Sequence, residues 1–118
     1  MTNLAVCSVS QDRMSNKYDG VAITEVKDAK IVDRFVTTDG NDLNYVLTGV
    51  LVKVKCKGGI AFWVVADLDE DTWFVTLPSL NTSDEEIMIA QDHISHALKG
   101  INIGRKTTIR FEEGEQQA

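Results

Sequence analysis

The sequence predicts a single α+β domain, with a mostly antiparallel sheet or a small partly closed β-barrel of about six strands and one helix. Most apolar residues lie in short runs rich in Val and Ile, or in strict alternation with polar residues, and both patterns indicate strands. Only residues 83–99 repeat their apolar residues at helical spacing. A length of 118 residues suits one domain with its own core, so residues 1–118 are assigned to one unit.

The N-terminal part of the chain predicts three short strands. Residues 4–9 form an apolar run that suits an edge strand, but residues 1–20 as a whole are rich in polar turn formers, so we expect this segment to be partly irregular. Residues 21–26 and 30–37 are rich in β-branched side chains, which favour strands. The three residues between these two segments are short enough for a hairpin turn.

The middle of the chain predicts a three-stranded meander. Residues 43–57 form a long strand whose second half alternates, and Gly49 stands where the pattern changes, as a bulge or bend requires. Residues 60–66 are apolar on both faces, as in a central strand. After a polar hairpin loop at residues 67–72, the strand at residues 73–77 returns.

The helix at residues 83–99 has the clearest boundaries. Ser83 and Glu86 have the spacing of a capping box, in which each side chain bonds the other residue's backbone N–H group. A last alternating strand follows at residues 106–112, and the polar tail at residues 114–118 is expected to fray. The order of elements is similar to that of an OB-fold core, as a topological analogy that no sequence motif supports.

The negative charge is concentrated in one segment. The chain carries a net charge of −6, yet the stretch between Lys57 and Lys99 holds eight acidic residues and no Lys or Arg. The rest of the chain therefore carries a net charge of +2. Such asymmetry indicates a surface that attracts a partner of opposite charge.

We therefore predict a non-catalytic binding module, of the inhibitor or adaptor type, that presents an acidic surface to a basic protein partner. If the hairpin loop and the helix N-terminus lie close together, their carboxylates form one negative patch, and two apolar residues of the helix anchor the partner. The predicted partner-binding residues are Asp67, Asp69, Glu70, Asp71, Glu85, Met88, Ile89 and Asp92.

Two alternatives remain open. The first is an OB-like module that binds single-stranded nucleic acid through a basic strand face and aromatic side chains; its basic residues are Lys53, Lys55, Lys57 and Arg110. The aromatic residues that such a surface could use are Tyr45, Phe62, Trp63 and Trp73. The second alternative is a structural subunit that forms homo-oligomers through an edge strand at residues 4–9.

Two groups of residues have spacings that suggest metal binding, and we interpret both as solvated surface. Asp67, Asp69 and Asp71 alternate like calcium-loop ligands, but the glycine and the bidentate glutamate of such a loop are missing at the required positions. The second group consists of Asp92, His93 and His96. It supplies too few ligands for structural zinc. We predict no metal site.

The remaining chemistry of the sequence predicts no enzyme, no cofactor and no membrane association. Cys7 and Cys56 fit no redox or zinc spacing, and no motif of a nucleophile, phosphate-binding or dinucleotide-binding site occurs. The longest apolar run, residues 60–66, is far shorter than the roughly 20 residues that cross a bilayer. We expect a cytoplasmic location with both thiols reduced.

Overall fold

A computed structural model describes residues 23–38, 40 and 44–113 of the chain. The expected edge strand at residues 4–9, the irregular segment at residues 1–20 and the tail at residues 114–118 lie outside the described residues. The elements are β1 (Val26–Thr38), β2 (Tyr45–Cys56), the short 3₁₀ helix η1 (Lys57–Gly59), β3 (Ala61–Asp69), β4 (Thr72–Leu77), α2 (Asp84–Lys99) and β5 (Thr108–Glu113).

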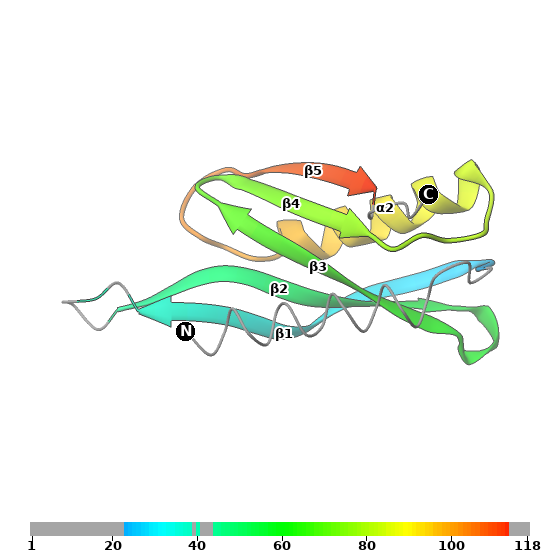
Figure 1. Cartoon of the computed structure of the whole chain (residues 1–118), viewed down its shortest axis with the longest axis horizontal. Coiled ribbons are helices and arrows are strands. Elements are labelled where there is room, and N and C mark those ends of the chain that lie inside the picture. Colours follow the sequence, from blue (N-terminus) through cyan, green and yellow to red (C-terminus); the bar gives the residue numbers. More distant parts are fainter. Residues whose placement is uncertain (1–22, 39, 41–43, 114–118) are drawn as a thin grey trace.

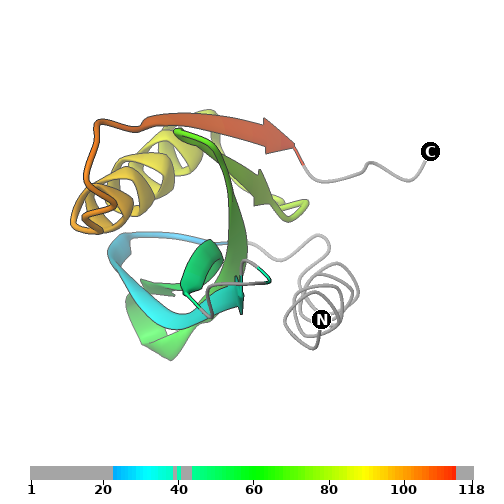
Figure 2. The same ribbon diagram turned by 90° about the vertical axis from the view of Figure 1, so that its left-hand side faces the viewer.

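The five described strands form one sheet in the order β1-β2-β3-β4-β5 (Figure 1). The first four strands pair antiparallel, whereas β5 runs parallel to β4 because α2 carries the chain back before β5 begins. The predicted α+β class, the mostly antiparallel sheet and the helix before the last strand are confirmed. Of the two expected arrangements the open sheet is present: it curves around α2 without closing into a barrel (Figure 2).

The first described strand differs from the prediction. The expected strand at residues 30–37 is present as part of β1, but the hairpin before it is wrong, because β1 is one continuous strand that pairs with β2 over its whole length. Of the strand expected at residues 21–26, only Val26 is in β1, residues 23–25 are not strand, and residues 21–22 lie outside the described residues. The register of β1 shifts between Val26 and Asp28, and again between Ile31 and Asp33. These bulges each add one residue to β1, so the period-2 pattern that would reveal one strand is interrupted in the sequence.

The alternation predicted for β2 is confirmed. Val50, Val52 and Val54 are fully buried on the face of the sheet that packs against α2, which we call the inner face. The predicted bulge at Gly49 is also present, because the register passes from the pair Phe35–Gly49 to the pair Val36–Leu47 and leaves Thr48 unpaired. The hydroxyl of Thr48 donates a hydrogen bond to the Phe35 carbonyl oxygen at 3.0 Å.

The hairpin between β3 and β4 is tighter than predicted. The polar loop expected at residues 67–72 is wrong, since β3 continues to Asp69 and β4 begins at Thr72. Only Glu70 and Asp71 remain as the turn, and Glu70 adopts a positive φ of 58°. Polar residues continue the ladder because their side chains project from the outer face of the sheet, opposite the inner face, where water solvates them.

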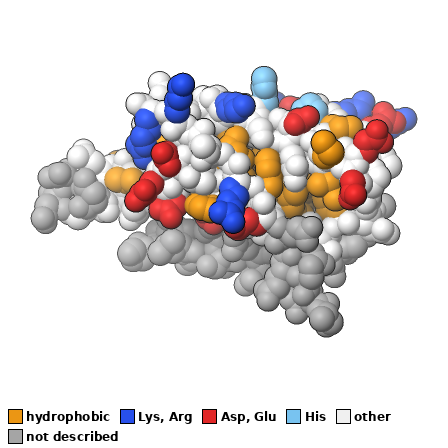
Figure 3. Space-filling view, turned by 90° about the horizontal axis from the view of Figure 1, so that it is seen from above, with side chains coloured by type: hydrophobic (Ala, Val, Ile, Leu, Met, Phe, Trp, Pro, Cys, Tyr) orange, Lys and Arg blue, Asp and Glu red, His pale blue; other side chains and the backbone are white. Residues whose placement is uncertain are grey.

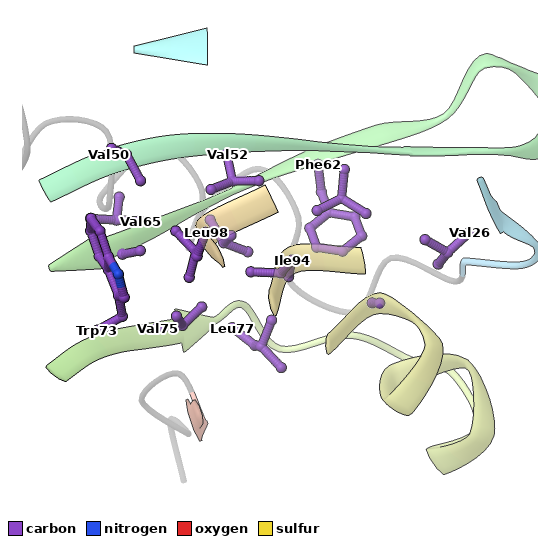
Figure 4. Packing of buried hydrophobic residues seen from close by; sticks show 14 of the residues in the cluster. Val26, Val50, Val52, Phe62, Val65, Trp73, Val75, Leu77, Ile94 and Leu98 are labelled. Atoms are coloured by element: carbon purple, nitrogen blue, oxygen red, sulfur yellow. The ribbon is translucent and has the colours of Figure 1, made fainter. Parts of the chain in front are cut away.

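The hydrophobic core lies between the inner face of the sheet and α2 (Figure 4). Ala90, Ile94 and Leu98 face the sheet from α2 at four-residue intervals and are fully buried, as the helical spacing predicts. Phe62 and Trp73 are fully buried as well. Removal of these side chains from water is the main source of stability for the fold.

Polar contacts fix where α2 begins. The Glu86 N–H group donates to the Ser83 hydroxyl at 3.2 Å, which confirms Ser83 as the N-cap. The carboxylate of Glu86 instead accepts a hydrogen bond from the Val26 N–H group at 3.4 Å, so the capping box is half formed. Glu86 thereby connects the first turn of α2 to the start of β1.

Replacing Ser83 by alanine is expected to lower the free energy of unfolding by about 1 kcal/mol, because the Glu86 N–H group loses its acceptor. Chemical denaturation of the parent and the variant measures this change. Ser83→Asp restores an acceptor at the cap and should keep the parent stability within a few tenths of a kcal/mol. Equal stability of the alanine variant and the parent would contradict the assigned cap.

Candidate functional site

The predicted acidic residues lie in two separate places. Asp69, Glu70 and Asp71 form the tip of the β3–β4 hairpin, at one end of the molecule, whereas α2 begins at the other end (Figure 1). β4 leaves the tip, and α2 then runs back over 16 residues, a length of about 24 Å. Acidic side chains accordingly appear toward both ends of the face seen in Figure 3. The hairpin tip and the helix N-terminus therefore do not form one patch.

The hairpin tip is held by the segment that leads into β5. Arg105 Nη2 donates a hydrogen bond to the Glu70 carbonyl oxygen, and the Thr108 N–H group donates to the Asp71 carbonyl oxygen at 2.9 Å. The hydroxyls of Thr72 and Thr108 lie 3.1 Å apart. Arg105 places a positive charge beside the acidic tip, so the electrostatic field there is weaker than the sequence alone indicates. These contacts hold the hairpin tip against the start of β5.

The acidic residues of the helix share a surface with its two exposed apolar residues. Glu85, Met88, Ile89 and Asp92 follow one another at spacings of three, one and three residues, which places them on one face of α2. We call these four residues the α2 outward stripe. Met88 is 63% exposed and Ile89 is 37% exposed, on the side of the helix away from the buried Ala90.

Among the described residues, no side chain forms an ion pair with the charged groups of the α2 outward stripe. Within the part of the chain that the structure describes, ion pairs join Lys57 to Glu25 and Arg110 to Glu112, and neither involves the stripe. The single Lys or Arg side chain of α2 is Lys99, in its last turn. The surface therefore combines two apolar side chains with a carboxylate one turn before them and another one turn after them.

The basic residues predicted for nucleic-acid binding are only partly brought together. Lys53 and Lys55 lie on the outer face of β2, as predicted. Lys57 belongs to η1, and its Nζ atom pairs with the Glu25 carboxylate at 3.0 Å. Arg110 lies on β5, three strands from β2 and hence about 14 Å away.

The aromatic residues predicted for base stacking are also only partly available, because some of them lie in the core. Phe62 and Trp73 are fully buried, so the prediction that they could stack on a ligand is wrong. Tyr45 is 77% exposed, at the start of β2. Trp63, which the apolar run assigns to the core, is half-buried on the outer face, where the Lys53 Nζ atom lies 5.4 Å from its ring centroid.

Lys30 on β1 was missed by the sequence interpretation. The register places Lys30 directly opposite Lys53, and Lys53 in turn opposite Trp63. The bulges of β1 hide this neighbour in the sequence, because they break the alternation from which its face could be read.

The other chemistry-bearing groups in the described ranges are not assembled into a site. Among the described residues, no group of three or more His, Cys, Asp or Glu side chains is placed to hold a metal ion. Burial raises the pKa of the Cys56 thiol, and the negative charge of Glu86 raises it further, so the reactive thiolate is disfavoured at neutral pH. No helix in the described ranges is long and apolar enough to cross a membrane.

Comparison of the chain with protein-family models, with curated proteins and with solved structures found no match.

Proposed function

We propose that this protein is a non-catalytic binding module and that the α2 outward stripe docks a basic segment of a protein partner. The observation that carries this proposal is the exposure of Met88 and Ile89 between two acidic residues on one helical face. Apolar side chains surrounded by charged groups are the usual composition of an interface centre with its rim. The carboxylates of Glu85 and Asp92 then select a partner with Lys or Arg beside its own apolar residues.

The attachment of α2 to the sheet supports this choice of surface. Ile94 and Leu98 are fully buried against the sheet, and the Glu86 carboxylate bonds to the backbone of Val26. The backbone of a fixed helix is already ordered before binding, so little backbone conformational entropy is lost on binding, which favours affinity. The hairpin tip is the weaker candidate, because Arg105 lies against it. We place the module in the cytoplasm, where the free thiol of Cys56 stays reduced.

The chemistry of the stripe defines the expected partner. Met adapts its shape to different apolar surfaces, so Met88 suits a pocket or an apolar ridge of another protein. A basic amphipathic helix offers both required features, with apolar residues on one face and Lys or Arg beside them. Attraction between opposite charges should make association faster at low salt.

Capture of partners from a native cell lysate by the tagged protein tests the proposal. The variant Met88→Lys/Ile89→Lys replaces the apolar anchors with charges that repel a basic partner. Both positions are exposed and lysine favours helices, so the fold should be kept. We expect this variant to lose the partner that the parent retains, with a loss of at least tenfold in affinity, about 1.4 kcal/mol.

The matched control is Asp69→Lys/Asp71→Lys, which changes the net charge more strongly but alters only the hairpin tip. It should retain the partner. If the hairpin variant loses the partner while the stripe variant keeps it, the proposal is wrong and the tip is the binding surface. Equal loss in both variants would show that only net charge matters, which also contradicts the proposal.

A further inference from the structure

Two lysines face each other across the first pair of strands. Lys30 on β1 is the direct register partner of Lys53 on β2. Their neighbours Val52 and Val54 are fully buried on the inner face, so both lysines project from the outer face. Lys55 lies two residues further along β2 on that same face. We call Lys30, Lys53 and Lys55 the outer lysine cluster.

The two opposed lysines are expected to lower the stability of the sheet. Like charges directly across an antiparallel pair repel and destabilise it. In the described part of the chain, no carboxylate lies within ion-pairing distance of the cluster, since the ion pairs there involve Lys57 and Arg110. Asp28 is the register partner of Lys55, which leaves the Lys30–Lys53 pair without an acidic partner across the strands. A local conflict of this kind is expected at a functional site, where a bound anion removes the repulsion.

An aromatic ring continues the same row of the sheet. Trp63 on β3 is the register partner of Lys53, whose Nζ atom lies 5.4 Å from the centroid of the ring. Lysines beside an aromatic side chain are the combination with which proteins bind single strands, since lysines contact phosphates and the ring stacks on a base. The acidic hairpin tip is remote, because Asp69 lies six residues further along β3, about 20 Å away.

We propose that the outer lysine cluster binds the phosphates of single-stranded nucleic acid, with one base beside Trp63. Charge complementarity selects a polyanion, and the aromatic ring favours unpaired bases over a duplex. This site is independent of the α2 outward stripe, because α2 packs on the inner face of the sheet (Figure 2). The strand register places the cluster on the opposite face. Each surface can therefore be altered without the other.

Fluorescence anisotropy of a labelled thymidine strand of about twenty nucleotides, titrated with the full chain at several salt concentrations, tests the proposal. The test variant is Lys30→Gln/Lys53→Gln, and the charge-matched control is Lys99→Gln/Lys106→Gln. The test variant should bind at least about tenfold more weakly at low salt. The slope of log affinity against log salt should become shallower by about 1.4, since each phosphate contact to a single strand contributes about 0.7. The control should change affinity by less than about twofold.

The melting temperature provides a second readout, because removing the opposed charges should leave the test variant as stable as the parent or more stable. Weaker binding together with kept stability supports a binding role for the pair. The proposal is overturned if the parent does not bind the strand at low salt, or if both variants lose affinity equally. It is also overturned if a duplex of the same length binds more tightly than the single strand.

Discussion

Replacing Phe62 by alanine is expected to lower the free energy of unfolding by about 3–5 kcal/mol. Phe62 is fully buried, and it lies between the inner face of the sheet and α2, near Ile94 (Figure 4). Its removal leaves a cavity between two layers that cannot fully collapse, because the backbone hydrogen bonds of β3 fix its position. Domains of this size are stable by about 5–15 kcal/mol, so the variant should unfold at far lower denaturant concentration.

Phe74→Ala is the matched control for this prediction. Phe74 is half-buried and lies on the outer face, opposite Asp67 and Arg110. The same change of side chain there should lower the free energy of unfolding by clearly less than at Phe62, since less apolar area returns to water. Comparable losses at the two positions would show that α2 is not packed on the inner face as described.

Replacing Gly49 by alanine is expected to have the second large effect and to lower the free energy of unfolding by about 1–3 kcal/mol. A Cβ atom at this position would lie 2.9 Å from the Ala66 carbonyl oxygen and 3.4 Å from Phe35 Cδ2. The first of these atoms belongs to the backbone of the neighbouring strand, so relief requires the β2–β3 pairing to shift. Thermal or chemical denaturation measures the loss.

Gly100→Ala provides the same chemical change without the close contact. Gly100 has helical backbone angles at the end of α2, and its added Cβ would meet the Ala97 carbonyl oxygen at 3.4 Å. Alanine there reduces the freedom of the unfolded chain, so the free energy of unfolding should change by less than about 1 kcal/mol. If Gly49→Ala were equally harmless, the close approach of β2 and β3 at the bulge would be contradicted.

The elements that the sequence predicted correctly are those whose pattern is local. The face of α2 follows from the spacing of Ala90, Ile94 and Leu98, and its start follows from Ser83. The buried face of β2 follows from the alternation after Gly49. Each of these signals depends on residues within one or two turns of helix or a few positions of strand, so no knowledge of distant neighbours is needed.

The errors arose where the outcome depends on pairing between distant segments. β1 is continuous because β2 pairs along all of it, and its bulges conceal this in the sequence. The polar ends of β3 and β4 belong to the ladder because Asp69 and Thr72 are register partners. The Trp63 ring faces outward because strand register, and not its apolar neighbours in sequence, assigns its face.

The candidate site shows the same division between local and distant information. The α2 outward stripe was predictable, because Glu85, Met88, Ile89 and Asp92 share one helical face by spacing alone. The separation of the hairpin tip from this stripe was not, because it depends on α2 running back along the sheet after β4. The partner role of Lys30 required the β1–β2 register.

Backbone amide chemical shifts of the isotope-labelled protein, recorded with and without its captured partner, test the central claim most directly. If the α2 outward stripe is the binding surface, the amides of Glu85, Met88, Ile89 and Asp92 should shift most strongly, while those of the hairpin tip stay in place. Shifts concentrated at Asp69, Glu70 and Asp71, with α2 unchanged, would contradict the account.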